Sequence, residues 1–351
     1  MNGYKKWLIA ALLISVTSTA LIVGLTFESK TFDALKEIRL EYILAASLFH
    51  ILAYIIWGIR FRTLCKALGY RVNFLRAIEI TLSSAFAAAI TPASAGGEPL
   101  RIHLLHSDGV PIGKATAIVI GERLLDAVFI LTSLPFAFYI MRNVFSSYEL
   151  DAVFLTANLL VLIILAMFLF GVWKPAKLKI IIYGITEKLS PFLGKRTDSA
   201  LSHFRMRLDT EIDFFHESVR TFFKEGKTGL ILGIAYTILF WFLDFMPLIL
   251  ILKGLSQTPP TLTAMAAQII LAMILIVPAT PGASGVAELG AVPIFSTFVA
   301  APILGVTVLA WRAVTYHMNL LLGGIISLKV LKDMDLIKKI TGSSSELKQV
   351  P

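Results

Sequence analysis

Two arginines stand inside apolar stretches of this chain, and the residues around them occur in the same order twice. A segment of Thr-Pro, small residues and a glutamate (91–99) precedes Arg123, and a similar segment (280–288) precedes Arg312. Each arginine follows its Thr-Pro pair at the same spacing, so the pattern predicts an internal duplication. A guanidinium stays protonated and offers a planar fork of donors, so two arginines in apolar surroundings suit the capture of a phosphate.

Carboxylates near each arginine also allow purely structural ion pairs that hold a helical bundle together. The candidate partners of Arg123 are Glu98, Glu122 and Asp126, and the candidate partner of Arg312 is Glu288. In the functional interpretation these groups gate access to the arginines or couple transport to an ion. The candidates for gating or ion coupling are Glu98, Glu122, Asp126, Asp244, Glu288 and His317. For Asp244 and His317 a hydrogen-bonded structural role is the alternative.

Small residues at both breaks are candidates for contact with a lipid head group. Backbone N–H groups freed at a helix amino terminus favour a phosphate, and we expect such groups near Gly97 and Gly285. Glycines at a loop tip also permit positive φ and close approach of the backbone. The predicted head-group ligands are Arg123, Arg312, Ser94, Gly96, Gly97, Ser284 and Gly285. A simple helix kink is the alternative for each break.

The composition of the chain is that of an integral membrane protein. Hydrophobic residues make up 57% of the 351 residues, charged residues 16%, and the mean hydropathy is +0.80. The net charge of +9 sits in short segments between apolar runs, which favours loops that face anionic lipid over nucleic-acid binding. With a single cysteine, no metal-ligand spacing among the histidines and no nucleotide motif, we expect no metal and no cofactor.

The elements that must position these residues follow from the apolar runs and the basic loops. The run lengths predict transmembrane helices at 7–27, 42–59, 115–141, 153–173, 228–252 and 302–328. The basic residues from Arg60 to Arg76 are assigned to a cytoplasmic loop, and both termini are predicted to be cytoplasmic. We therefore expect a multi-pass protein of the cell membrane.

Two further segments are broken by the Thr-Pro motifs and are predicted to be re-entrant hairpins. One (78–110) enters from the cytoplasmic side and the other (262–300) from outside, although the first arm of the second is nearly long enough to span. The resulting fold is an all-α polytopic bundle of two inverted-topology repeats, at about 42–141 and 228–328. Such repeats are typical of secondary transporters, whose broken helices meet near the midplane.

The whole chain (1–351) is predicted to be one membrane domain. Segment 174–227 has apolar residues every three or four positions, which indicates an amphipathic cytoplasmic connector that lies on the membrane or under the bundle. Segment 342–351 is predicted to be a disordered tail.

At the residues named above, the chain resembles the transmembrane domain of the lysylphosphatidylglycerol synthetase/flippase family. The match rests on segments 92–101 and 281–288, on Glu122-Arg123 with Asp126, and on Arg312 with Tyr316. The family has Pro-Gly where this chain has Pro92-Ala93. Larger members carry a soluble aminoacyl-transferase domain for which these 351 residues leave no room. The resemblance therefore implies lipid translocation and not aminoacylation.

These observations together predict a protein that moves an anionic lipid between leaflets without ATP. The lipid would be a phospholipid, an aminoacyl-phospholipid or a polyprenyl-phosphate-linked lipid. One alternative is an intramembrane lipid-modifying enzyme that uses Glu98, Glu122, Asp126 and His317 as acid and base groups. Another is a scaffold that presents lipid to partner enzymes through segment 174–227. The sequence identifies neither the lipid, the coupling ion, the oligomeric state nor any protein partner.

Overall fold

A computed structural model describes residues 38–91, 94–142, 220–224, 226–275 and 285–330, with isolated positions such as Lys36 and Ala283. Throughout these residues the regular secondary structure is helical. The helices are α3 (Leu40–Ala67), α4 (Phe74–Ile90), α5 (Gly97–Ser107), α6 (Ile112–Arg142), α10 (Lys227–Gly254), α11 (Thr261–Leu275), α12 (Val286–Phe295) and α13 (Ala301–Arg312), followed by the π-helical segment η4 (Ala313–His317).

Within the described ranges, four helices are long and apolar enough to cross a membrane. They are Leu40–Ala67, Ile112–Arg142, Lys227–Gly254 and Ala301–Val330. These helices coincide with four of the predicted spans and confirm an all-α membrane protein. The predicted spans 7–27 and 153–173, most of the connector 174–227 and the tail 342–351 lie outside the described residues.

The second predicted span is longer than expected, and this corrects the assignment of Arg60. The prediction ended that helix at Ile59 and put Arg60 in a cytoplasmic loop, whereas α3 continues to Ala67 and buries Arg60 completely. No helix breaker occurs before Gly69, which has a φ of 90°. The apolar face formed by Phe61 and Leu64, both fully buried, continues through the basic stretch and keeps the helix packed.

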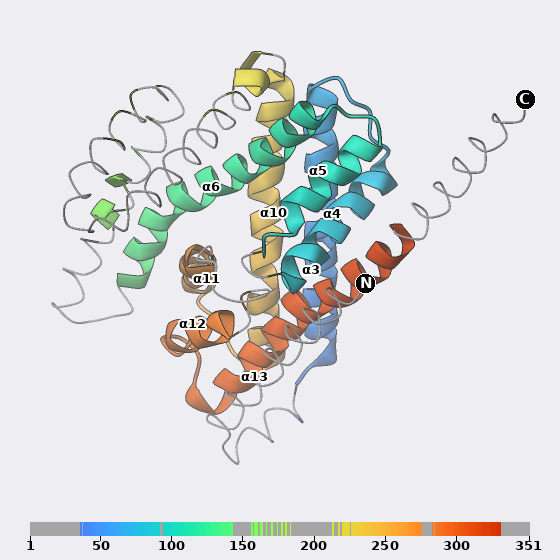
Figure 1. Cartoon of the computed structure of the whole chain (residues 1–351). Helices are drawn as coiled ribbons and strands as arrows, with labels where there is room; N and C mark the ends of the chain where they lie inside the picture. The colour runs from blue at the N-terminus through green and yellow to red at the C-terminus, as the bar shows by residue number, and fades with distance from the viewer. Residues whose placement is uncertain are drawn as a thin grey trace, which may run out of the picture.

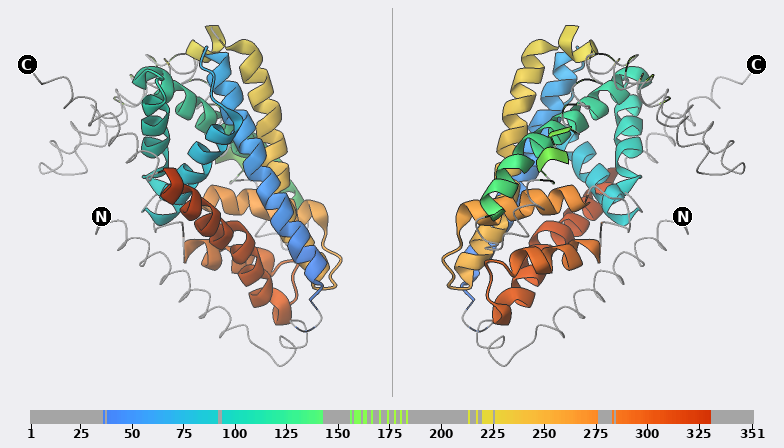
Figure 2. Two further views of the ribbon diagram at one scale, coloured as in Figure 1. Left: turned by 90° about the vertical axis from the view of Figure 1, so that its right-hand side faces the viewer. Right: turned by 90° about the vertical axis from the view of Figure 1, so that its left-hand side faces the viewer.

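Helices α3 and α10 form a long antiparallel pair, here called the central pair, which stands in the middle of the view in Figure 1 and runs from one end of the fold to the other in Figure 2. The Arg39 N–H before α3 donates to the carbonyl of Gly254 at the end of α10, at 3.0 Å. At the other end, Gly229 packs so closely on Ala67 that an added Cβ would lie 2.2 Å from the Ala67 Cβ. Small residues thus let the two long helices approach, as is common between membrane helices.

Two shorter helix pairs lie at opposite ends of this central pair, as Figure 2 shows. The first, α4–α5, begins just after α3 ends, and the second, α11–α12, begins just after α10 ends. Because α3 and α10 are antiparallel, their carboxyl ends lie at opposite ends of the bundle. This arrangement agrees with hairpins that start from opposite sides, but the orientation of the repeats in the membrane stays a prediction.

The breaks inside the two helix pairs share an unusual backbone conformation. Ser94 in the first break has a φ of 55°, and Ala283 in the second has a φ of 52°. Gly96, predicted to supply a positive φ, is instead right-handed helical at −85°, while Gly285 adopts 85°. Position 96 requires glycine because its backbone lies close to Thr91: an added Cβ would lie 2.9 Å from the Thr91 side chain.

Each broken pair packs against the long helix that follows the other pair. Helix α11 lies along α6, and α4 lies against the last helix beyond η4. At the second contact an added Cβ on Gly323 would lie 2.8 Å from the Leu82 carbonyl oxygen. The Tyr316 hydroxyl donates to the carbonyl of Ala89 at 3.3 Å. The two halves of the chain are therefore interlocked.

Candidate functional site

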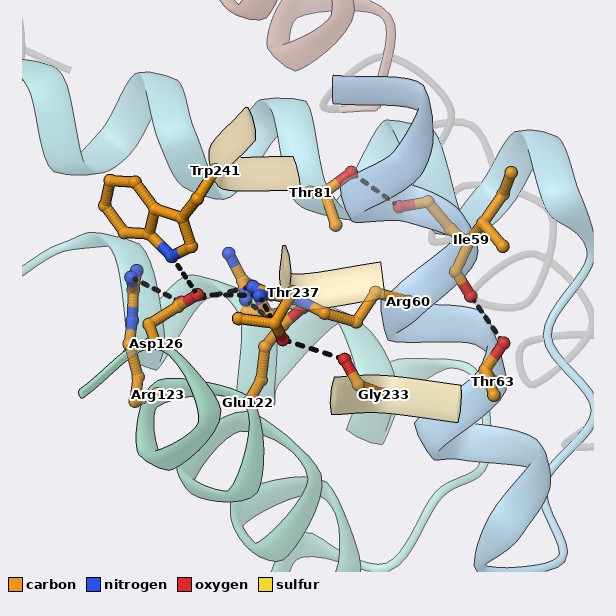
Figure 3. Close-up of polar contacts among 12 residues, drawn as sticks. Ile59, Arg60, Thr63, Thr81, Glu122, Arg123, Asp126, Gly233, Thr237 and Trp241 are labelled. Carbon is orange, nitrogen blue, oxygen red and sulfur yellow. Dashed lines mark hydrogen bonds and ion pairs between the residues drawn. The ribbon is translucent and has the colours of Figure 1, made fainter. Parts of the chain in front are cut away.

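A buried cluster of charged side chains joins α3, α6 and α10 (Figure 3). Arg60 donates from Nε to Oε1 of Glu122 at 3.0 Å. Its Nη1 and Nη2 donate to the two carboxylate oxygens of Asp126 at 2.6 and 3.1 Å, and Nη1 also donates to the Thr237 hydroxyl at 3.0 Å. Bidentate pairing of this kind fixes the guanidinium plane and the direction of both carboxylates.

Arg101 of α5 reaches the other oxygen of the same glutamate. Its Nη1 donates to Oε2 of Glu122, and its Nε and Nη2 donate to the Ser84 hydroxyl of α4 at 3.0 and 2.8 Å. The guanidinium lies over the Trp57 ring at 4.8 Å. Arg101 and Glu122 are both buried. Glu122 therefore accepts from two arginines and ties α3, α5 and α6 together.

The open edge of the cluster is the ion pair between Arg123 and Glu98. Arg123 Nε lies 2.7 Å from Glu98 Oε1, and Nη1 lies 3.9 Å from an oxygen of Asp126. The Arg123 side chain is 42% exposed and that of Glu98 35% exposed. Trp241 of α10 covers Asp126 from another side, donating from its indole N–H at 3.2 Å (Figure 3). Arg123 is thus the accessible arginine of an otherwise buried cluster.

The formal charges of this cluster cancel. A net charge at membrane depth is costly, so a balanced set is the expected arrangement for ionised groups inside a bundle. Removing one of the buried members leaves a buried charge only partly paired, which is the expensive outcome for such networks. The cluster consists of Arg60, Arg101 and Arg123 with Glu98, Glu122 and Asp126.

A second arginine–glutamate pair lies at α12 and the last helix. Arg312 Nε donates to Glu288 Oε1 at 2.8 Å, and the guanidinium lies over the Tyr316 ring at 4.0 Å. The other oxygen of Glu288 accepts from the Gly285 N–H at 2.6 Å. The exposed fractions of the two side chains are 6% and 0%. The π-helical turn that follows Arg312 is of a type found often at functional sites.

The small residues predicted to bind a head group occupy different positions. Gly97 is the first residue of α5 and packs on α4, whereas the Gly96 N–H donates to the Thr91 hydroxyl at 2.9 Å. Ser94 is exposed at the tip, and Ser284 lies outside the described residues. Since Glu288 occupies the Gly285 N–H, a phosphate would have to displace this carboxylate there.

The two other predicted coupling residues are apart from the first cluster. Asp244 Oδ1 on α10 lies 3.2 Å from Nδ1 of His50 on α3. His317 Nδ1 lies 3.2 Å from the carbonyl oxygen of Arg312 in the π-helical turn. His317 therefore belongs with the second pair, and Asp244 with the central α3–α10 interface.

A polar network at one end of the bundle joins the start of α4 to its neighbours. Arg76 donates to both carboxylate oxygens of Asp108 at 2.8 Å, and these hydrogen bonds raise the pKa of Arg76. Lys329 near the end of the last helix donates to Glu79 at 2.6 Å. These contacts link α4 to the end of α5 and to the last helix.

One cavity of about 270 Å³ opens between α10, α11 and the last helix. It is mainly apolar, and polar groups of Asp244, Gln268 and Thr315 line it together with the Trp241 ring. Across the described residues, no group of three histidine, cysteine or acidic side chains is placed to hold a metal ion. The cavity thus combines an apolar wall with one carboxylate.

Sequence analysis missed several residues that complete the site. Arg60 was assigned to a loop because it belongs to a dense run of basic residues. The signal for a helix was the apolar residues that continue at helical spacing through this run. Arg101 lies in segment 92–101, which carries the family resemblance, but it was given no role. Partners in other helices carried no local signal, because they come from segments distant in sequence. These missed residues are His50, Arg60, Ser84, Arg101, Thr237 and Trp241.

Comparison with known proteins gives consistent matches over most of the chain. The sequence model of the family described as lysylphosphatidylglycerol synthase TM region matches residues 8–323. A UPF0104 membrane protein of Archaeoglobus fulgidus is 31% identical over 90% of this chain and 94% of its own length. UPF0104 membrane proteins of Pyrococcus horikoshii and Methanocaldococcus jannaschii are 25% and 26% identical over 93% and 92% of this chain, and over 97% and 95% of their own lengths.

Proposed function

This chain belongs to the lysylphosphatidylglycerol synthase TM-region family, and from that premise we propose that it moves an anionic lipid between membrane leaflets without ATP. The lipid class is a phospholipid, an aminoacyl-phospholipid or a polyprenyl-phosphate-linked lipid. The observation that carries the proposal is the accessible Arg123–Glu98 pair at the edge of a buried, charge-balanced cluster. The proposed setting is the cell membrane, with both termini in the cytoplasm.

Arg123 is the group proposed to receive the lipid phosphate. Its present partner, Glu98, is partly exposed, and an ion pair in such surroundings contributes only about 0–1 kcal/mol. A phosphate offers the same fork of guanidinium donors at least as many acceptor oxygens. Phosphate can therefore replace the carboxylate at small cost, while Glu98 turns towards water.

The buried members of the cluster are proposed to hold Arg123 in place. Asp126 is fixed by the bidentate contact from Arg60 and by the Trp241 N–H, and it lies 3.9 Å from Arg123. Glu122 and Arg101 link this arrangement to α5, the helix that carries Glu98. A rigid support of this kind limits the positions that the guanidinium can take.

The Arg312–Glu288 pair is proposed to be the equivalent site of the second repeat in a closed form. Both side chains are buried, and the glutamate is held by a backbone N–H as well as by the arginine. In an alternating-access cycle, the second pair would open to a lipid when the first pair closes. The opposite ends at which the two helix pairs begin are consistent with such a cycle.

The test is lipid movement in liposomes that contain the purified protein and a fluorescent anionic lipid, without nucleotide. A membrane-impermeant quencher reports how much label is in the outer leaflet. We expect faster equilibration than in protein-free liposomes, and a loss of about tenfold or more in Arg123→Gln, equivalent to roughly 1.4 kcal/mol. Arg71→Gln, at an exposed arginine outside the cluster, is the matched control and should keep the wild-type rate.

Other results would favour different functions. Equal rates for anionic and zwitterionic lipids would indicate nonspecific scrambling. Chemical change of the lipid in detergent, without any bilayer, would favour the lipid-modifying enzyme. A scaffold would show no acceleration for any lipid and would lose function when segment 174–227 is deleted.

A further inference from the structure

We propose that Asp244 and His50 form a proton-binding site inside the bundle, and that lipid movement is coupled to the release of its proton. The proton site stands on its own geometry. Its coupling to a lipid rests on the proposed function.

The site lies within the central helix pair. His50 on α3 is 4% exposed, and its Nδ1 lies 3.2 Å from Oδ1 of Asp244 on α10. Both ring nitrogens are buried, and neither makes a hydrogen bond of regular geometry in the part of the chain that the structure describes. The imidazole therefore depends on Asp244 for its polar contact.

The partner of Asp244 differs from that of the other carboxylates in the bundle. Glu98, Glu122, Asp126 and Glu288 all face arginines. Arginine does not release its proton under physiological conditions, so these pairs keep their charges. Histidine changes its protonation state near neutral pH. Among the ion pairs in the described spanning helices, the Asp244–His50 pair is therefore the one suited to exchange a proton.

The net charge of the Asp244–His50 pair changes when it releases a proton. With one proton the pair is neutral, as Asp⁻ with His⁺ or as a protonated carboxyl with neutral imidazole. After the proton leaves to water, the pair carries one negative charge. That charge is unfavourable inside a membrane unless another group compensates it. Proton release is thus tied to a rearrangement that brings a cation or water to the pair.

Among the described residues, the groups that face the pair from neighbouring helices supply no compensating cation. From α3 the Tyr54 ring lies 4.9 Å from the His50 ring. Gln268 of α11 lines the cavity beside Asp244, but its amide donates to the carbonyls of Phe245 and Ala264. The last helix contributes Trp311 and Thr315 to the lining, while its Arg312 is bound to Glu288. From α6, Asp126 accepts from Trp241, which lines the cavity, and is otherwise bound to Arg60.

The cavity gives the proton a route and connects the two proposed sites. The Asp244 side chain is 27% exposed and borders the cavity of about 270 Å³. Trp241 lines the same cavity, and its indole N–H donates to Asp126 in the cluster that supports Arg123. A single side chain therefore lines the cavity that borders the proposed proton site and donates to the cluster of the proposed lipid site.

The first measurement detects the proton directly, in detergent and without any lipid transport. A proton on the pair appears as a doubly protonated His50 ring in ¹⁵N NMR or as a protonated carboxyl band in the infrared. We expect one of these signals in the wild type and its loss in Asp244→Asn. His103→Gln, at an exposed histidine of α5, should leave it unchanged. A wild type that shows neither signal would overturn the proton site.

The second measurement uses liposomes with a pH difference of one unit across the membrane and no membrane potential. One proton per lipid would produce about a tenfold leaflet asymmetry at equilibrium in the wild type. Asp244→Asn and His50→Gln should still equilibrate the lipid but lose the asymmetry. Lipid movement without any asymmetry in the wild type would refute coupling and leave the proposed function intact. A detected proton without lipid movement would uphold the site and reject the proposed function.

Discussion

The two arginine–glutamate pairs of this protein have nearly the same nitrogen–oxygen distance and very different surroundings. In each, the arginine Nε contacts Oε1 of the glutamate, at 2.7 Å for Arg123–Glu98 and 2.8 Å for Arg312–Glu288. The first pair is partly exposed, whereas the second is buried. The same two residue types therefore form a partly exposed ion pair in one place and a buried ion pair in the other.

The difference follows from the second contacts of each residue. Glu288 also accepts from the Gly285 N–H, and the Tyr316 ring covers Arg312. Glu98 lies in the first turn of α5, where Gly97 packs against α4 and the glutamate side chain stays partly exposed. Burial and extra partners strengthen an ion pair only when every charge is satisfied, which is the case around Glu288.

The largest effect is expected at Glu122, which accepts hydrogen bonds from two buried arginines of the cluster. Glu122→Gln removes the charge that Arg60 and Arg101 share, and leaves buried guanidinium groups only partly compensated. We expect a loss of about 3–5 kcal/mol in the free energy of unfolding, measured by denaturation in detergent. Glu98→Gln is the control and should cost less than about 1 kcal/mol, since that pair is partly exposed. Similar losses in both variants would contradict the division into open and buried members.

Replacing each arginine with lysine tests the comparison directly. Arg312→Lys removes the planar group that lies over Tyr316 and bonds Glu288, so we expect a loss of about 2 kcal/mol in stability. Arg123→Lys should change stability by less than about 1 kcal/mol but slow lipid movement, because lysine lacks the bidentate fork. Stability comes from the same detergent denaturation, and transport from the liposome assay. Full transport with Arg123→Lys would reject bidentate phosphate recognition.

Much of the fold was predictable from the sequence because the length of an apolar run indicates the length of a membrane helix. The spans at 42–59, 115–141, 228–252 and 302–328 follow from that rule. Arg60 was misplaced because the same rule treats a basic run as a loop, while the helix continues wherever one face stays apolar. Local hydropathy cannot show which way that face points.

The ion pairs were predictable only in part. The predicted structural partner of Arg312 was Glu288, and this contact is present. The predicted partners of Arg123 were Glu98, Glu122 and Asp126; the contacts with Glu98 and Asp126 are present, whereas Glu122 pairs with Arg60 and Arg101. The partners of Glu122 were not foreseen. They come from α3 and α5, and their contact depends on how each helix is rotated about its axis. Spacing within one segment carries no information about that rotation.

Reactivity at the two breaks gives a smaller effect that sharpens the comparison. With the buried Cys65 replaced by alanine, cysteine is introduced at Ala95, which is exposed, or at Ala283, which is partly buried. We expect a water-soluble thiol reagent to label Ala95→Cys about tenfold faster than Ala283→Cys, a difference of roughly 1.4 kcal/mol in activation free energy. Equal rates would mean that the two breaks are equally open in the membrane.

The smallest effect is expected from replacing either of two tryptophans that border the same cavity. One contacts the cluster that contains Arg123, and the other lies on the helix that carries Arg312. Trp241 donates to Asp126 in the accessible cluster, whereas Trp311 packs edge-on against Phe295. Trp241→Phe keeps an aromatic ring next to Phe129 but leaves an oxygen of Asp126 without its indole donor. One such hydrogen bond contributes about 1 kcal/mol, so Trp241→Phe should lower the free energy of unfolding by that amount.

The consequence for transport separates the two tryptophans more clearly than stability does. If Asp126 positions Arg123, Trp241→Phe should weaken the effect of anionic lipid on thermal stability as well as slow its movement. Trp311→Phe is the matched control, because it removes a similar volume from the cavity wall without touching the cluster. Equal transport losses in the two variants would point to cavity shape as the cause. A transport loss confined to Trp241→Phe would instead identify the lost hydrogen bond with Asp126 as the cause, since both changes leave the arginines themselves intact.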